Sequence, residues 1–240
     1  MEIYRKWDIA ELIRDNPYVG RGIIVGKTAN GKKAVAAYFI MGRSENSRNR
    51  IFTEKNGEVF TEPFDASRVQ DPSLIIYAAI RQKDDQLIVT NGDQTDTIWN
   101  GLNNGLTFSG ALEARCFEPD APNFTPRISA LLTFAEKDFS YRMSILKSID
   151  AEGSDCARYE FAYPSKAGLG HFIHTYVTDG SPIPTFQGEP ERIDIPDDVK
   201  AFTDEVWGAL NEQNKISLYV RAVDLENGET ENYLINKNVR

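Results

Sequence analysis

Arginines gather in one short segment of an otherwise acidic chain. The segment MGRSENSRNR at 41–50 contains Arg43, Arg48 and Arg50 against one acidic residue, Glu45, whereas the whole chain has a net charge of -9. A guanidinium group offers paired donors that suit a phosphate, so this segment is a candidate anion site. The alternative is a solvated charged loop, which is the commoner use of a short basic run.

Another arginine occurs where an unpaired charge is costly. Arg21 lies in YVGRGIIVGKT, at the expected start of a strand with apolar neighbours. A buried guanidinium without a partner costs free energy, so we expect Arg21 to meet an anionic group.

Two further polar clusters lie in or beside expected loops. Asn91 opens NGDQTD at 91–96, which could recognise a purine or ribose edge, or could be a turn whose side chains bond their own backbone. Glu118, Asn123 and Arg127 lie in FEPDAPNFTPRI at 117–128, where three prolines restrict the chain. Rigid loops often carry catalytic groups, although proline-rich loops also occur for structural reasons alone.

Several common kinds of site are not indicated by the residues. His171 and His174 are three residues apart in an expected strand, so they point to opposite faces. With two histidines and two isolated cysteines, Cys116 and Cys156, we expect no metal site and no disulfide framework. The sequence lacks GxSxG, P-loop and complete GxGxxG motifs.

Composition limits the class of protein. The chain has 240 residues, of which 41% are hydrophobic and 26% charged, enough for one sizeable core. The net charge of -9 and a pI of about 4.9 argue against nucleic acid and anionic membranes as partners. Without a secretory signal or an apolar run of about 20 residues, a soluble cytoplasmic protein is expected.

The polar clusters must be positioned by elements that the sequence pattern predicts. Turn signals at 29–31, 56–57, 83–85 and 226–229 predict hairpins between β-rich runs. Helices are expected over 8–15, 105–117 and 197–212, and the remaining strands over 128–136, 139–148 and 171–179. Antiparallel runs with few intervening helices predict an α+β fold without internal repeats.

The clusters, taken together and in order, resemble the archaeal-type inosine monophosphate (IMP) cyclohydrolase family. The matching segments are YVGRGIIVGKT, AVAAYFIMGRS with NR at 49–50, IIYAAIR, VTNGDQTD and FEPDAPNFTPRI, with a weaker echo in HTYVTDGSPIPTFQGEP. The resemblance implies one domain over 1–240, with 1–15 as an N-terminal extension. It also implies a four-layer αββα sandwich of two antiparallel sheets, similar to N-terminal-nucleophile (Ntn) hydrolases but without a terminal nucleophile.

The resemblance further implies a reaction and a set of roles. The substrate would be 5-formamidoimidazole-4-carboxamide ribotide (FAICAR), closed to IMP with loss of water, without metal or cofactor. The implied acid/base is Glu118, and the implied donors to the formyl oxygen are Arg50 and Tyr77. The implied substrate-binding residues are Arg21, Arg43 and Arg127 for the phosphate or for holding Glu118 ionised, and Asn91 and Asn123 for the base or carboxamide.

The chain also departs from the family pattern. Two additional residues separate Arg43 from Arg50, which predicts a changed presentation of these arginines, and Phe117 replaces a common tyrosine beside Glu118. Two other functions therefore stay open: a C–N hydrolase for another formylated or amide nucleotide, and a non-catalytic purine-nucleotide-binding paralogue. A homo-oligomer also stays open, because compact sandwich enzymes often assemble symmetrically.

Overall fold

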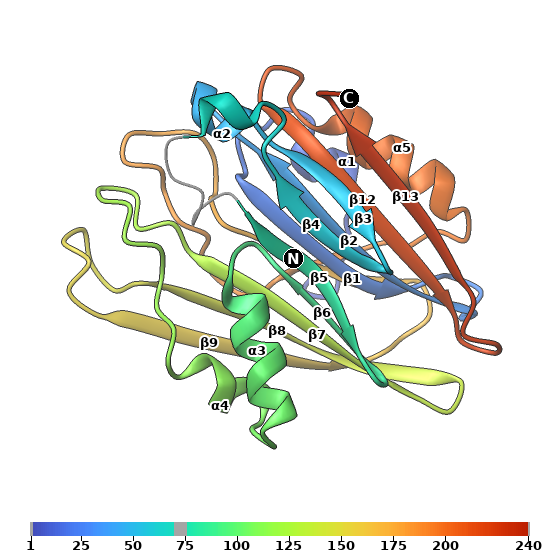
Figure 1. The fold of residues 1–240 in the computed structure, drawn as a ribbon. Helices are drawn as coiled ribbons and strands as arrows, with labels where there is room; N and C mark the ends of the chain where they lie inside the picture. Colours follow the sequence, from blue (N-terminus) through green and yellow to red (C-terminus); the bar gives the residue numbers. More distant parts are fainter. Residues whose placement is uncertain (1, 70–75, 240) are drawn as a thin grey trace.

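The computed structural model describes residues 2–69 and 76–239, and in them the chain forms two antiparallel β-sheets (Figure 1). The first sheet has the strand order β11-β10-β1-β2-β12-β13, and the second has the order β3-β4-β5-β6-β7-β8-β9. The α+β class predicted from the sequence is confirmed.

The first sheet comprises β1 (Arg21–Lys27), β2 (Lys33–Met41), β10 (Leu169–His174), β11 (Glu191–Ile193), β12 (Lys215–Asp224) and β13 (Thr230–Asn236). The second comprises β3 (Ile51–Lys55), β4 (Glu58–Glu62), β5 (Tyr77–Lys83), β6 (Gln86–Thr90), β7 (Arg127–Ala135), β8 (Asp138–Ser148) and β9 (Cys156–Pro164). The helical elements are α1 (Ile9–Ile13), α2 (Glu45–Arg48), α3 (Gln94–Asn103), α4 (Phe108–Leu112), α5 (Val199–Ala209) and the short 3-10 helix Ala66–Arg68.

The hairpins predicted from turn signals are confirmed. The turn between β3 and β4 is formed by Asn56 and Gly57, with φ of 54° and 77°, values that these two residue types tolerate well. Lys83 pairs with Gln86 across the turn between β5 and β6. The expected run before β5 began at Leu74, but Leu74 and Ile75 lie outside the described residues.

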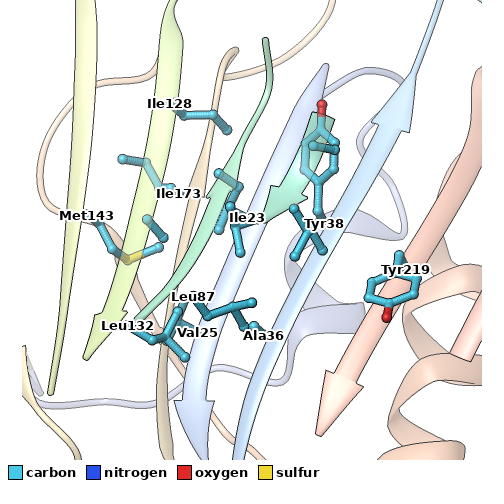
Figure 2. Close-up of a cluster of buried hydrophobic side chains, with 14 of the residues drawn as sticks. Ile23, Val25, Ala36, Tyr38, Leu87, Ile128, Leu132, Met143, Ile173 and Tyr219 are labelled. Carbon is cyan, nitrogen blue, oxygen red and sulfur yellow. The ribbon is translucent and has the colours of Figure 1, made fainter. Parts of the chain in front are cut away.

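The main core lies between the two sheets. Alternation along a strand sends Tyr38 into this core, while its neighbour Phe39 points to the opposite face of the sheet. Ile23 of the first sheet and Ile128 and Met143 of the second belong to the same buried cluster (Figure 2). The hydroxyl of Tyr38 points away from the labelled aliphatic side chains, so this tyrosine connects the apolar core to polar surroundings (Figure 2).

Helices cover the outer faces of both sheets (Figure 1). On the first sheet, α1 and α5 share a buried cluster with Val35 and Leu218, and on the second sheet α3 and α4 pack against Ile88 and Leu131. Helix α5, expected over 197–212, buries an apolar face that contains Val199, Phe202 and Val206. Helix α1 begins after Asp8, whose carboxylate accepts the amide of Ala10 at 2.7 Å.

The expected single helix over 105–117 is wrong. The chain instead forms α3 and then α4, separated at Gly105, whose φ of 79° belongs to a helix end. Leu106, which lies within the expected helix, is 51% exposed and packs in none of the buried clusters of the described residues. The strand expected over 171–179 ends at His174.

Two strands were not predicted, β9 and the short β11. Strand β9 follows β8 at the edge of the second sheet, where its side chains are mostly exposed or only partly buried. The segment places Tyr159, Phe161 and Tyr163 at alternate positions, and Phe161 and Tyr163 pack against the main core, so a strand could have been predicted here.

Among the described helices, none has the length and apolar character needed to cross a membrane.

Candidate active site

A cavity of about 280 Å³ opens at the end of the molecule where α2 lies (Figure 1). Its walls come from the start of β1, the turn after β2, the residue before β3, the end of β6, the loop before β7 and the segment after β10. Both sheets therefore contribute to one site. The lining residues are Tyr18, Arg21, Arg43, Ser44, Asn46, Ser47, Arg50, Asn91, Glu118, Asp120, Asn123, Thr125, Tyr176 and Ile183.

Most of the predicted site residues meet in this cavity. Arg21, Arg43, Arg50, Asn91, Glu118 and Asn123 all line it, although they are spread over about a hundred residues of sequence. Tyr77 and Arg127 do not belong to the lining and lie behind it.

Two cationic side chains of the cavity lie near each other. Arg21 begins β1, and the buried Arg50 immediately precedes β3. Within the described part of the chain, neither guanidinium has a hydrogen-bond or ion-pair partner, and Nε of Arg50 is buried and unpaired. Burial, followed by the charge of Arg21, lowers the pKa of Arg50. This pair of guanidinium groups needs a negatively charged or strongly accepting ligand to satisfy it.

Tyr77 forms part of a tyrosine pair beside these arginines. Its hydroxyl lies 2.8 Å from the hydroxyl of Tyr38, and both side chains are buried. The pKa of Tyr38 is raised by burial first and then by the proximity of Tyr77, while Arg21 and Arg50 act in the opposite direction. Tyr38 therefore keeps its proton next to the two guanidinium groups.

Glu118 provides a carboxyl group in the cavity. Its side chain is only 14% exposed, and its Oε1 lies 3.1 Å from Nη1 of Arg127. Burial raises the pKa of Glu118, and the opposing charges of Arg127 and Arg21 do not cancel that effect. A carboxyl group with a raised pKa is suited to exchange protons near neutral pH.

Arg127 holds Glu118 from behind. Nη1 of Arg127 also donates to Asp93 at 2.7 Å and to the side-chain oxygen of Gln94 at 2.8 Å. Burial alone would raise the pKa of Asp93, but the hydrogen bond from Arg115 and the charge of Arg127 outweigh it and lower that pKa. Asp93 therefore stays ionised and compensates the charge of Arg127.

The amide of Asn91 is already engaged by the protein. Its Nδ2 donates to the carbonyl of Pro126 at 2.9 Å, and its Oδ1 accepts the backbone amide of Ile128 at 2.9 Å and Nε2 of Gln94 at 2.8 Å. This network joins the end of β6 to the start of β7 and to α3. Asn91 therefore touches the cavity chiefly as a structural residue.

Asn123 is freer than Asn91. Its Oδ1 accepts the backbone amide of Ile183 at 3.2 Å, while its Nδ2 has no hydrogen-bond partner among the residues described. Of the two predicted asparagines, Asn123 is the one with an available donor in the cavity.

Arg43 lies at the mouth of the cavity. Its Nη1 donates to the carboxylate of Asp179 and to the carbonyl of Gly180 at 2.8 Å, and its guanidinium lies 5.3 Å from the ring centre of Tyr18. Its side chain is 35% exposed, which leaves other donors facing solvent.

The longer spacing between Arg43 and Arg50 is used to build α2. Ser44 and Ser47 form a reciprocal capping box at its start, and Arg48 turns away to the carbonyl of Gly42 at 3.0 Å. Arg43 and Arg50 still reach the same cavity, one from each side of the helix.

The other carboxylate of the proline-rich loop is committed to the loop itself. Asp120 accepts the amide of Thr125 at 2.6 Å and also the hydroxyl of Thr125, which in turn lies beside the hydroxyl of Tyr176. These contacts tie the loop to the segment after β10. They leave Glu118 as the carboxyl group free for chemistry.

Several residues of the wall were not predicted from the sequence. Those missed are Tyr18, Ser44, Asn46, Ser47, Asp120, Thr125, Tyr176 and Ile183. Six of them lie in polar or family-like segments that precede position 130. Tyr176 and Ile183 lie in the more weakly matching segment HTYVTDGSPIPTFQGEP. The signal was therefore present in the motifs, but nothing in the spacing showed which side chains face the cavity.

The arrangement combines a protonatable carboxyl group with unpaired cationic donors. Such a site can neutralise negative charge that develops on an oxygen atom and can move a proton at a neighbouring atom. The described residues hold no group of three or more histidine, cysteine or acidic side chains placed to bind a metal ion.

Comparisons with known proteins give one consistent result. A family model described as IMP cyclohydrolase-like protein matches residues 18–228. A protein named IMP cyclohydrolase from Methanopyrus kandleri is 33% identical over 165 residues, which cover 63% of this chain and 81% of that protein. Proteins of the same name from Methanococcus aeolicus and Methanothrix thermoacetophila are 30% and 34% identical over 163 and 122 residues, covering 66% and 48% of this chain and 74% and 58% of theirs.

Proposed function

The chain belongs to the IMP cyclohydrolase-like protein family, and from this premise we propose that it is an IMP cyclohydrolase that closes FAICAR to IMP with loss of water. The reaction forms a bond between the carboxamide nitrogen and the formyl carbon of one molecule. The resulting carbinolamine then loses its hydroxyl group as water. Orientation of two groups that already belong to the same molecule supplies much of the acceleration.

One observation carries this proposal. Glu118, with its raised pKa, shares a cavity with the unpaired guanidinium groups of Arg21 and Arg50. Ring closure places negative charge on the formyl oxygen and requires removal of a proton from the carboxamide nitrogen. The guanidinium group of Arg50 and a protonatable carboxyl group are the donor and acceptor that these two changes need.

The roles within the cavity follow from access. Glu118 removes the carboxamide proton and returns a proton to the departing hydroxyl group. Arg50 donates to the formyl oxygen. Tyr77, which lies behind the wall, supports Arg50 through the tyrosine pair rather than by direct contact.

The rest of the nucleotide is bound around this centre. Arg43 at the mouth binds the phosphate together with Arg21, and Arg127 keeps Glu118 in place instead of contacting substrate. Asn123 recognises the base or carboxamide with its available Nδ2, whereas Asn91 acts by fixing the wall.

Membership of the family also supports proposals for the fold, the domain, the location and the partners of the protein. The two facing sheets with helices outside support the four-layer αββα arrangement of Ntn hydrolases, with Glu118 in place of a terminal nucleophile. We treat 1–240 as one domain, with 1–15 as an extension whose helix α1 packs on the first sheet. We further propose that the substrate is a soluble nucleotide and that nucleic acid is not a partner. The protein is proposed to be cytoplasmic and to assemble symmetrically with copies of itself.

The test is turnover of FAICAR followed by absorbance without added metal, with Glu118→Gln and the exposed Glu113→Gln in parallel. We expect Glu118→Gln to lose about 10²–10⁴-fold in kcat, the usual contribution of a general acid/base, with IMP affinity largely retained. Glu113 is a matched control on the same stretch of chain, and its variant should keep the wild-type rate.

Other outcomes decide against parts of the proposal. Full activity in Glu118→Gln would remove this carboxyl group from the mechanism. Saturable IMP binding without turnover by the wild type would identify a non-catalytic nucleotide-binding paralogue. Turnover only of another formylated or amide nucleotide would identify a related C–N hydrolase.

A further inference from the structure

Other parts of the chain cover three of the four edge strands of the two sheets. Edge strand β11 is bonded to the N-terminal segment, where the amide of Trp7 donates to the carbonyl of Arg192 at 2.8 Å and the carbonyl of Trp7 accepts the amide of Asp194 at 2.9 Å. Edge strands β13 and β3 are joined by Asn236, whose side chain accepts the amide of Phe52 at 2.8 Å and donates to its carbonyl at 3.0 Å. The remaining edge strand is β9, at the border of the second sheet (Figure 1).

Strand β9 presents a row of unpaired backbone groups. Its register with β8 is unbroken over the whole strand, and just beyond it the amide of Ser165 donates to the carbonyl of Phe139 in the same register. Because antiparallel strands exchange bonds at every second residue, the odd-numbered residues of β9 bond to β8 and the even-numbered ones face outward. Among the residues described, nothing bonds to the outward amides and carbonyls of Arg158, Glu160 and Ala162. An uncovered edge of this length is a template for pairing with another strand.

We propose that β9 pairs with β9 of a second copy of this chain, antiparallel about a two-fold axis that passes beside Tyr159. The inference rests on the symmetric self-assembly included in the proposed function, and it names the surface that this assembly uses. Antiparallel pairing of a strand with its own copy is closed by a single two-fold rotation, so it gives a dimer and stops there. The seven-stranded sheets of the two copies then form one continuous sheet across the dimer.

Charge selects the register of this pairing. Outward-facing residues must lie opposite outward-facing residues, and an axis at Tyr159 places Arg158 opposite Glu160 of the second copy, twice by symmetry. An axis at Arg158 or at Glu160 would place like charges directly opposite each other, which is unfavourable. An axis at Phe161 would place Arg158 opposite Pro164, which has no amide to donate. The axis at Tyr159 therefore gives the most complete and best-matched pairing.

The side chains beside the axis can take a further partner. Nη1 of Arg158 donates to the carbonyl at the end of α4 at 2.9 Å, and the carboxylate of Glu160 accepts from Arg142 and from the hydroxyl of Ser109. A guanidinium has several donors and a carboxylate has several lone pairs, so both groups keep bonding capacity. Tyr159 is 48% exposed and lies at a position that does not bond outward. In the dimer its ring meets its own copy across a non-hydrogen-bonded pair, where side chains approach closely.

The interface is tested by measuring the mass of the full chain in solution by analytical ultracentrifugation. We expect the wild type to have twice the mass of the 27.0 kDa chain. Ala162→Pro should be a monomer, because proline removes an outward amide and no bond to β8. Ala162→Ser keeps that amide and is the matched control, which should stay dimeric. A monomeric wild type, or an Ala162→Pro variant that assembles like the wild type, would overturn the proposal.

Exchanging the two charges tests the register without relying on proline. Arg158→Glu places two carboxylates opposite each other at two symmetric positions, so it should raise the dissociation constant of the dimer. The double variant Arg158→Glu/Glu160→Arg restores opposite charges and should lower that constant again, which a variant that fails to fold would not do. A double variant that dissociates as readily as Arg158→Glu would contradict an axis at Tyr159.

Cross-linking locates the axis directly. In a Cys116→Ser/Cys156→Ser background, Tyr159→Cys brings two thiols together across the axis, where Cα atoms about 4.5 Å apart permit a disulfide. Oxidised glutathione should therefore convert this variant into a covalent dimer. Phe161→Cys in the same background is the control, because its thiol lies opposite residue 157 of the second copy. No cross-link at position 159, or equal yields at both positions, would overturn the register.

Turnover of FAICAR by the same samples separates this interface from the enzyme function. The lining of the cavity, among the residues described, includes no residue of β9, so Ala162→Pro should keep the kcat of the wild type per chain. A monomeric wild type that turns over FAICAR would overturn the interface alone. A dimer that dissociates in Ala162→Pro but shows no turnover would overturn the enzyme function alone.

Discussion

Glu118 is held in an environment that opposes its charge. It is mostly buried, its pKa is raised, and the guanidinium of Arg127 at 3.1 Å compensates only part of the cost of burial. A group of this kind contributes to function at the expense of stability, because its ionised form is better solvated in the unfolded chain. The trade-off can be measured separately from activity.

We expect Glu118→Gln to be more stable than the wild type at pH 7. Since the folded-state pKa lies above the unfolded value, the folded protein binds more protons between the two, and stability falls as pH rises through that window. Glutamine mimics the protonated form and avoids this loss. Urea unfolding should show a gain within the range of about 0.5–2 kcal/mol that such substitutions commonly give at pH 7, shrinking toward pH 4. A less stable variant at pH 7 would contradict this account.

Arg127 should control the pH at which Glu118 ionises. Removing its positive charge disfavours the carboxylate, so Arg127→Gln should raise the acidic limb of the kcat/KM profile by about 1 unit or more, the usual effect of an adjacent guanidinium. Arg115→Gln is the matched control because Arg115 pairs with Asp93, while Glu118 is held by Arg127. An acidic limb that stays in place in Arg127→Gln, or moves equally in both variants, would show that Arg127 does not tune Glu118.

At the scale of elements, the Asn91 network fastens the wall of the cavity. Replacing Asn91 with Leu leaves the buried amide of Ile128 and carbonyl of Pro126 without their side-chain partner. Unsatisfied buried groups cost about 1–3 kcal/mol each, so urea unfolding should show a loss of roughly that size or more. Asn123→Ala should instead raise KM with little change in stability. Unchanged stability with weakened IMP binding in Asn91→Leu would restore a direct recognition role for Asn91.

Local signals explain which elements could be predicted from the sequence. Asn56, Gly57 and Asp84 adopt the positive φ angles of tight hairpin turns. Because these residue types tolerate such angles, both hairpins could be predicted from the sequence. The break at Gly105 was missed because the apolar spacing continues across it, although the chain there adopts a helix-ending conformation. Edge strand β9 does carry alternating aromatic residues, but they are exposed or only partly buried, and its place in the sheet depends on pairing with β8.

The sequence indicated which segments contribute to the candidate site, but not how their side chains are arranged. The ordered motifs gathered the residues that line the cavity, but the motifs do not say which side chains face inward. The partnership of Arg127 with Glu118 and that of Tyr77 with Tyr38 depend on how separate strands align across the sandwich. The position of Arg127 and Tyr77 behind the wall therefore could not be read from sequence.

For the whole molecule, the main consequence is that one cavity uses both sheets. Arg21 begins a strand of the first sheet, Arg50 precedes a strand of the second, and the Glu118 loop leads into β7. A ligand that pairs with both arginines would connect the sheets at the end where the apolar core gives way to polar side chains. Binding should then stabilise the molecule as a unit.

FAICAR bound to the inactive Glu118→Gln variant is therefore expected to raise the free energy of unfolding and to protect amides in both sheets. At a ligand concentration of 100 times Kd, mass action gives about 2.7 kcal/mol for a ligand that binds only the folded state. Hydrogen exchange should slow at the start of β1 and at β3 together, because Arg21 and Arg50 would then share one anionic or strongly accepting ligand. Arg50→Gln should lose most of this stabilisation and the protection at β3. Protection confined to one sheet would mean that the two arginines do not bind the same ligand. Residues of both sheets would then line the cavity, but ligand binding would not stabilise the two sheets together.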